Sequence, residues 1–223
     1  MTMIKQLKGL QFPDDYLIKF FFKTKLNKKK KNVLELGCSN GNNLNLFFNY
    51  GWNVTGVDNN KKNIINAKHN FKVLKKKLFL KNNYFFFEED MLSFIKKQDN
   101  LSYDTIIFAN SLYYLEYQKI IEILDCIKNK ISKKTNIFFR IRLSGDQRAK
   151  MSKKISKFTH LINFKNTNEI NCLNTFFTKQ KFITMIKNKF NVKSETSLEI
   201  KYENLINNKI FFNNDLVFWC AIS

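Results

Sequence analysis

Residues 33–41 read Val-Leu-Glu-Leu-Gly-Cys-Ser-Asn-Gly, and this stretch decides the fold of the chain. Its apolar start predicts a short buried parallel strand over 33–36, and the apolar positions of 42–50 predict a helix. The glycines between them predict a tight turn, where a ligand can lie against bare backbone at a helix N-terminus. A second strand is expected over 53–57. It is followed by Asp58, whose carboxylate could accept hydrogen bonds from both hydroxyls of a ribose.

The spacing of the turn residues narrows the class of ligand. The dinucleotide fingerprint Gly-x-Gly-x-x-Gly would need two further glycines, where the chain has Ser39 and Asn42. The pattern that fits is acidic-x-Gly-x-small-x-Gly, formed by Glu35, Gly37, Ser39 and Gly41. Here the sequence resembles the class I S-adenosylmethionine-dependent methyltransferases, in which a glycine usually stands at the position of Ser39. The alternative is a chance strand–glycine–helix unit of another α/β protein.

The resemblance implies S-adenosyl-L-methionine as cofactor and S-adenosyl-L-homocysteine as its product. In such enzymes an acidic and an apolar residue after the third strand hold the adenine. Asp90 and Met91 stand there, after a strand expected over 84–87, and helix capping by Asp90 is a compatible reading. Asn110, after a strand expected over 104–109, would face the sulfonium. The full set of predicted cofactor-binding residues is Tyr16, Glu35, Gly37, Cys38, Ser39, Gly41, Asn42, Asp58, Asn59, Asp90, Met91 and Asn110.

The rest of the pattern predicts an α/β fold with a Rossmann-like, doubly wound sheet of seven strands. The sheet is expected to be mostly parallel, with an antiparallel C-terminal hairpin over 192–199 and 210–222. Further helices are expected after Pro13 and over 59–78, 118–131 and 178–190, and a fifth strand over 135–141. We predict one methyltransferase domain over 1–223, with a helical lead-in over 1–31. Residues from about 143 to 177 lack strong periodicity and are predicted to form a substrate-binding, lid-like insert.

Composition restricts the class of protein. The 223 residues suit one domain with a sizeable core. The sequence has no apolar run of about 18 residues, which argues against a membrane span. The N-terminal residues do not resemble a signal peptide. The four cysteines are far apart, which predicts free thiols in a reducing cytoplasm and no metal site.

The formal net charge of +21 permits two interpretations. It could mark a nucleic-acid or membrane-surface partner, or it could reflect a coding bias that raised lysine over a solvated surface. Three of the 39 basic residues are arginines, and all three lie within nine positions: Arg140, Arg142 and Arg148. Such a cluster suggests a site that grips carboxylate or phosphate with two parallel hydrogen bonds. The alternative is a structural ion pair, for example with Asp146.

Methyl transfer is an in-line displacement that depends on positioning, so no catalytic constellation is required. A base is needed only if the acceptor arrives protonated. The candidates are Tyr113, Tyr114 and His160, with Asp146 also considered. The oligomeric state and the choice between N- and O-methylation stay open.

The arginines predict a small anionic acceptor, such as an ethanolamine phosphate-like amine or a nucleotide-linked sugar. The Arg-x-Arg, Gly-Asp-x-Arg and Asn-Thr-Phe elements at 140–142, 145–148 and 174–176 resemble methyltransferases of bacterial capsule and surface-polysaccharide pathways. Two alternatives remain: a tRNA or rRNA methyltransferase that uses the lysine-rich faces, and a non-catalytic binding subunit that keeps the fold.

Overall fold

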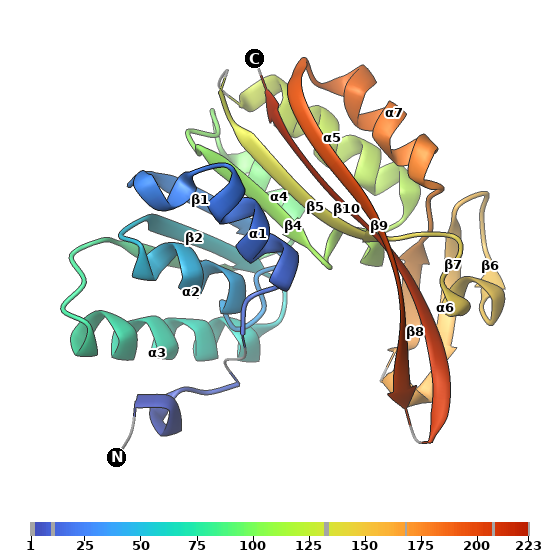
Figure 1. Ribbon diagram of the computed structural model, residues 1–223, viewed down its shortest axis with the longest axis horizontal. Coiled ribbons are helices and arrows are strands. Elements are labelled where there is room, and N and C mark those ends of the chain that lie inside the picture. The colour runs from blue at the N-terminus through green and yellow to red at the C-terminus, as the bar shows by residue number, and fades with distance from the viewer. Residues whose placement is uncertain (1–2, 10–11, 132–133, 168, 207, 223) are drawn as a thin grey trace.

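A seven-stranded sheet with the order β3-β2-β1-β4-β5-β10-β9 organises the computed structural model, which describes residues 3–9, 12–131, 134–167, 169–206 and 208–222 (Figure 1). The first five strands in this order are parallel, and β10 and β9 are antiparallel additions. The predicted fold class is therefore confirmed. The strands of this sheet are β1 (Asn32–Leu36), β2 (Asn53–Asp58), β3 (Tyr84–Glu88), β4 (Thr105–Ala109), β5 (Asn136–Arg142), β9 (Val192–Ile206) and β10 (Lys209–Ile222).

Helices cover both faces of the sheet and give two apolar cores (Figure 1). On one face pack α1 (Asp15–Lys23), α2 (Asn42–Asn49) and α3 (Lys61–Lys77), and on the other α4 (Met91–Lys97), α5 (Tyr117–Lys130) and α7 (Lys179–Lys189). Because β1 and β4 are buried on both faces, most of their residues are apolar and do not alternate with polar ones. Glu35 is a buried polar residue of β1. Short 3-10 helices are η1 (Met3–Gln6), η2 (Leu26–Lys28), η3 (Leu112–Tyr114) and η4 (Lys165–Thr167).

Polar side chains cap the N-termini of α1, α4 and α7 at positions that the sequence indicated. The Asp14 side chain accepts from the backbone N–H groups at the start of α1. Asp90 does the same for α4, and Thr178 caps α7. Such caps satisfy amide groups that have no partner within the helix, so they fix where each helix begins.

The segment 143–177 contains regular structure that the apolar periodicity of the sequence did not reveal. It contains a short helix, α6 (Gln147–Lys150), and a separate antiparallel sheet in the order β6-β7-β8. These strands are β6 (Lys153–Lys154), β7 (Thr159–Phe164) and β8 (Glu169–Thr175). Sequence periodicity missed them because buried polar residues, Glu169, Asn174 and Thr175, interrupt the apolar alternation of β8. We call residues 143–177 the insert.

The C-terminal hairpin is longer than the predicted strands. β10 pairs with β5 only from Asp215 to Ala221, while its pairing with β9 continues to Lys209. The outer half of the hairpin therefore extends past the main sheet, next to the insert (Figure 1). Among the described residues, no helix is long and apolar enough to cross a membrane.

Candidate functional site

A cavity of about 550 Å³ opens at the C-terminal ends of β1, β2, β3 and β4. The order of the strands reverses between β1 and β4, and this is where open α/β sheets bind their ligands. Seven predicted cofactor residues line the cavity: Gly37, Ser39, Asp58, Asn59, Asp90, Met91 and Asn110. Segments far apart in the sequence thus meet at one edge of the sheet.

The glycine turn forms a close-fitting floor for this cavity. Gly37 has φ 84° and Gly41 has φ 83°, which is the left-handed region that favours glycine. A Cβ on Gly37 would lie 2.3 Å from the Ser111 Cβ, so no side chain fits there. Ser39 adopts φ 47°, a conformation that costs a residue with a side chain some strain, and this explains why a glycine is usual at that position.

The Asp58 carboxylate is oriented by the turn that it faces. The backbone N–H of Ser39 donates to its Oδ2 at 2.9 Å, and the N–H of Asn60 donates to its Oδ1 at 2.9 Å. The Asn63 amide reaches Oδ1 at 3.4 Å. A carboxylate has about four acceptor positions, so Asp58 keeps capacity for a ligand hydroxyl.

Asp90 is held as an anion at the opposite wall. It caps α4 through the N–H groups of Leu92 and Ser93, at 3.1 and 3.2 Å. Burial alone would raise its pKa, but the Lys119 ammonium, 2.8 Å from Oδ2, and these N–H groups outweigh burial and lower the pKa. The capping role and a role toward an exocyclic amine are therefore compatible.

Five predicted cofactor residues do not line the cavity within the described chain: Tyr16, Glu35, Cys38, Gly41 and Asn42. The ring of Tyr16 lies 5.8 Å from the Arg140 guanidinium carbon. Cys38 is buried behind the turn, and burial raises the pKa of its thiol well above the ordinary value. Gly41 precedes α2, and Asn42 is its first residue.

Glu35 is buried under the turn with an incomplete set of partners. Asn43 Nδ2 donates to its Oε1 at 2.6 Å, while Oε2 has no hydrogen-bond partner among the described residues. Burial raises the pKa of Glu35 to about 8, against the lowering effect of the Asn43 hydrogen bond, and Asp58 and Asp14 add to the rise. The Asn43 Oδ1 also accepts from the Asp14 N–H at 2.9 Å, which ties the start of α1 to this site.

A second polar assembly lies beyond β5, and we call it the arginine cluster. It consists of three guanidiniums and four carboxylates: Arg140, Arg142, Arg148, Asp14, Asp146, Glu169 and Asp215. The side chains of the arginines are at most 15% exposed. This arrangement matches the structural alternative considered for the arginines rather than a site left open for an anion.

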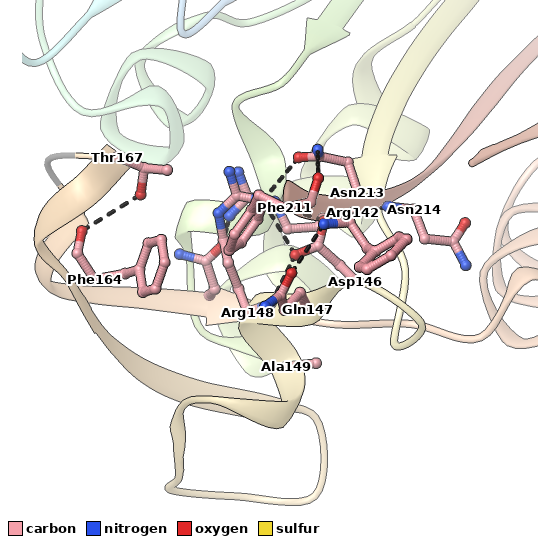
Figure 2. Close-up of polar contacts among 12 residues, drawn as sticks. Arg142, Asp146, Gln147, Arg148, Ala149, Phe164, Thr167, Phe211, Asn213 and Asn214 are labelled. Atoms are coloured by element: carbon pink, nitrogen blue, oxygen red, sulfur yellow. Dashed lines mark hydrogen bonds and ion pairs between the residues drawn. The ribbon is translucent and has the colours of Figure 1, made fainter. Parts of the chain in front are cut away.

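The contacts within the arginine cluster are short. Arg140 lies 2.5 Å from Asp14 and 2.7 Å from Asp215. Arg142 reaches Glu169 Oε1 at 2.8 Å. Arg148 Nη1 lies 3.1 Å from Asp146 Oδ1, and Figure 2 shows the two residues close together. Arg148 also donates from Nε to Glu169 Oε2 at 2.6 Å. Glu169 therefore holds two guanidiniums, one on each oxygen.

The three candidate bases are placed differently from one another. Tyr114 lines the cavity and donates to Glu169 at 3.1 Å, while the Tyr113 hydroxyl accepts from Arg142 at 3.3 Å. Burial raises the pKa of both phenols, so both stay protonated at neutral pH, which argues against either as a base. His160 lies in β7 against Ser152, at 2.8 Å, and is outside the cavity lining within the described chain. Burial, with Lys154, lowers the His160 pKa.

Several lining residues escaped the sequence prediction. Asn60 and Asn63 follow Asp58, and the helix-capping pattern at the start of α3 could have indicated Asn60. Ser111 lies under Gly37 and donates to the Leu36 carbonyl at 2.6 Å. Cys172 comes from β8 of the insert, and no local pattern could place it there. The remaining unpredicted residues of the lining are Val57, Glu89 and Leu115.

A larger cavity, of about 740 Å³, lies between α6 and the C-terminal hairpin. Its walls include Gln147, Lys150, Tyr202 and Asn213. Neither the glycine turn nor Asp58 belongs to its lining within the described chain, so it is separate from the site described above.

Comparisons with known proteins agree with the geometry of the cavity. The family model described as a methyltransferase domain matches residues 6–186. No curated protein sequence matches the chain.

Solved structures share the fold at low sequence identity. TehB from Haemophilus influenzae is 15% identical with a TM-score of 0.65, over 94% of this chain and 62% of that one. A methyltransferase from Methanosarcina mazei is 13% identical with a TM-score of 0.65, over 90% and 97%. The 1,6-didemethyltoxoflavin-N1-methyltransferase of Burkholderia thailandensis is 10% identical with a TM-score of 0.63, over 94% and 77%. This chain thus spans less than two thirds of the length of TehB.

The family match covers most of the chain, and the sheet order, the glycine turn and the cavity agree with it. The chain belongs to the class I S-adenosylmethionine-dependent methyltransferases.

Proposed function

We propose that this enzyme methylates a small molecule that binds beside Tyr114, under the insert. The observation that carries the proposal is the composition of the cavity wall. Tyr114 and Leu115 follow β4, and Cys172 comes from β8 of the insert, yet all three line the cavity that contains the predicted cofactor residues. A cavity covered in this way suits a compact acceptor better than a long polymer. The Burkholderia relative, which methylates 1,6-didemethyltoxoflavin, gives the same indication.

In this proposal the residues of the sheet edge hold S-adenosylmethionine. The backbone at Gly37 and Ser39 would lie against the ligand, Asp58 would accept from the ribose, and Asp90 and Met91 would contact the adenine. When bound, the cofactor supplies an activated methyl group. The protein contributes by holding the acceptor in line with that group, and positioning of this kind can lower a barrier by about 7–11 kcal/mol.

The three arginines, from which the sequence predicted an anionic acceptor, do not support a negative charge on the acceptor. Four carboxylates already face three guanidiniums in the arginine cluster, so an anionic acceptor would have to displace one of them. We therefore propose an acceptor held by the cavity wall and not by Arg140, Arg142 or Arg148. Arg148→Lys should then lower stability and leave the acceptor KM unchanged. A large rise in KM without a loss of stability would restore the anionic proposal.

Replacement of the carboxylate at position 58 tests the cofactor assignment. Asp58→Asn should weaken the binding of S-adenosylhomocysteine by about 10–100-fold, because hydrogen bonds to a charged group contribute about 1.5–3 kcal/mol each. Isothermal titration calorimetry measures this directly. Asp99→Asn, at an exposed acidic position away from the cavity, is the matched control and should bind like the parent. Equal affinity in the parent and Asp58→Asn would refute the assignment.

A panel of acceptors separates small-molecule from RNA methylation, the alternative that the net charge of +21 favours. Formation of S-adenosylhomocysteine is measured with neutral heterocycles, phosphorylated amines, nucleotide-linked sugars and bulk tRNA. Turnover of a neutral small acceptor should change little with salt. An RNA substrate should lose affinity steeply between 50 and 200 mM salt, because each phosphate contact releases counterions.

Free thiols at all four cysteines suit a reducing compartment such as the cytoplasm.

A further inference from the structure

The outermost strand of the main sheet, β9, has one unpaired edge. It is 15 residues long and, among the described residues, it pairs only with β10 (Figure 1). Most of its side chains are exposed. A long edge strand presents a row of free N–H and C=O groups that can pair with another strand.

The charges of β9 differ from those of the rest of the chain. The protein has a net charge of +21, but this strand carries Glu195, Glu199 and Glu203 against Lys193 and Lys201. Glu195, Glu199, Lys201 and Glu203 occupy alternate positions of the strand, so they project from one face of the sheet. Lys193 lies at a register shift between β9 and β10 and does not follow this alternation. Lys187 of α7, at 2.8 Å from Glu195, lies on that same face. Along this face the order is therefore Glu-Ser-Glu-Lys-Glu from 195 to 203.

We propose that β9 pairs antiparallel with β9 of a second copy of this chain, about a two-fold axis at Leu198. In this register Glu195 of each copy faces Lys201 of the other. Each contact occurs twice because an isologous interface repeats every pair. On the opposite face, Leu198, which is 45% exposed, meets its own counterpart and covers apolar surface.

The charges select this register over its neighbours. An axis at Ser197 would place Glu195 opposite Glu199. An axis at Glu199 would place that residue opposite itself and Glu195 opposite Glu203. Like charges directly opposite each other destabilise a strand pair, and opposite charges stabilise it.

An axis at Ile200, which is a register shift of four residues, would pair Glu199 with Lys201. It would not bring the two exposed Leu198 side chains together, whereas the axis at Leu198 does. The net positive charge of each copy opposes association only weakly, because salt screens exposed charges beyond about 8 Å at physiological ionic strength.

A charge exchange within the register tests the proposal on the full chain. Sedimentation equilibrium should find a dimer for the parent. Glu195→Lys and Lys201→Glu should each raise the dimer Kd by about tenfold or more, because two attractive contacts become repulsive. The double variant, Glu195→Lys with Lys201→Glu, should return the Kd to within about threefold of the parent, since it re-forms both contacts in reverse.

Two further variants make the result specific to this interface. Lys187→Ala removes the partner of Glu195 within its own chain and should leave the dimer intact. Leu198→Lys places two ammonium groups at the axis and should give a monomer that keeps the folded circular-dichroism spectrum of the parent. A parent that is monomeric at all concentrations, or a double variant as weak as the single ones, would overturn the proposal.

Discussion

Two glutamates, Glu35 in β1 and Glu169 in β8, are almost equally buried, at 1% and 6% exposure, yet they titrate in opposite directions. Burial raises the pKa of Glu35 to about 8, because within the described part of the chain the Asn43 amide is its one hydrogen-bond partner. Burial acts in the same sense on Glu169, but Arg142, the Thr167 hydroxyl and Arg148 outweigh it and lower the pKa to about 2. The partners of a buried carboxyl therefore decide its charge, whereas burial alone does not.

The same difference separates the two regions to which these glutamates belong. In the arginine cluster each charge faces an opposite one, and this assembly joins α1, β5, β10 and the insert. At the glycine turn one oxygen of the buried Glu35 carboxyl has no hydrogen-bond partner among the described residues, and backbone is held at positive φ. Paired charge fits a structural role, and incomplete partnering with local strain is typical of functional sites.

Removal of Glu169, which forms ion pairs with both Arg142 and Arg148, should have the largest effect on stability. Glu169→Ala leaves two buried guanidiniums short of a partner, so we expect a loss of about 3–5 kcal/mol in the free energy of unfolding. Denaturant titration by circular dichroism measures the loss. Glu122→Ala removes an ion pair with exposed Lys96 and should have a far smaller effect. Equal losses in the two variants would show that the cluster is not structural.

Replacement of Glu35 should have the opposite effect, because it should raise the free energy of unfolding at alkaline pH. The pKa of Glu35 is raised from 4.5 to about 8, so the unfolded chain loses this proton first as pH rises. Stability from this group is thus fully present below pH 4.5 and declines up to about pH 8. Glu35→Gln should stabilise the protein by about 2–4 kcal/mol at pH 8 and by little at pH 4, since one pKa unit corresponds to about 1.4 kcal/mol.

Urea titrations of the parent and Glu35→Gln between pH 4 and pH 9 test this expectation. The two stability curves should diverge as pH rises. Parallel curves would mean that Glu35 titrates normally, and the contrast between the two glutamates would then fail.

Relief of strain in the turn should give the smallest effect. Ser39 has φ 47°, so Ser39→Gly should stabilise the protein by about 0.5–1 kcal/mol. Ser93→Gly in α4 is the control, because glycine at an ordinary helical position lowers stability. Thermal unfolding separates the two outcomes by sign. A melting temperature that falls in both variants would show that Ser39 is not strained.

Much of the fold could be predicted from local patterns. The strand–turn–helix at 33–50 and Asp58 and Asp90 after their strands follow from apolar runs and capping residues, which act between near neighbours in sequence. Since the carboxyl ends of parallel strands share one edge, the motifs that end them were bound to meet, and seven predicted residues do line one cavity. The sequence by itself therefore determined the class of fold and the edge at which the predicted cofactor residues meet.

Only the tertiary structure decided the environment of the charged groups. The partner of Arg140, Asp14, lies 126 positions away, and its other partner, Asp215, lies 75 positions away. Cys172 reaches the cavity from an insert whose strands the apolar pattern did not reveal. Pairing and desolvation depend on which distant segments pack together, and a one-dimensional pattern carries no such distances. For this reason the arginines could be noticed in the sequence, but their neutralisation could not be foreseen.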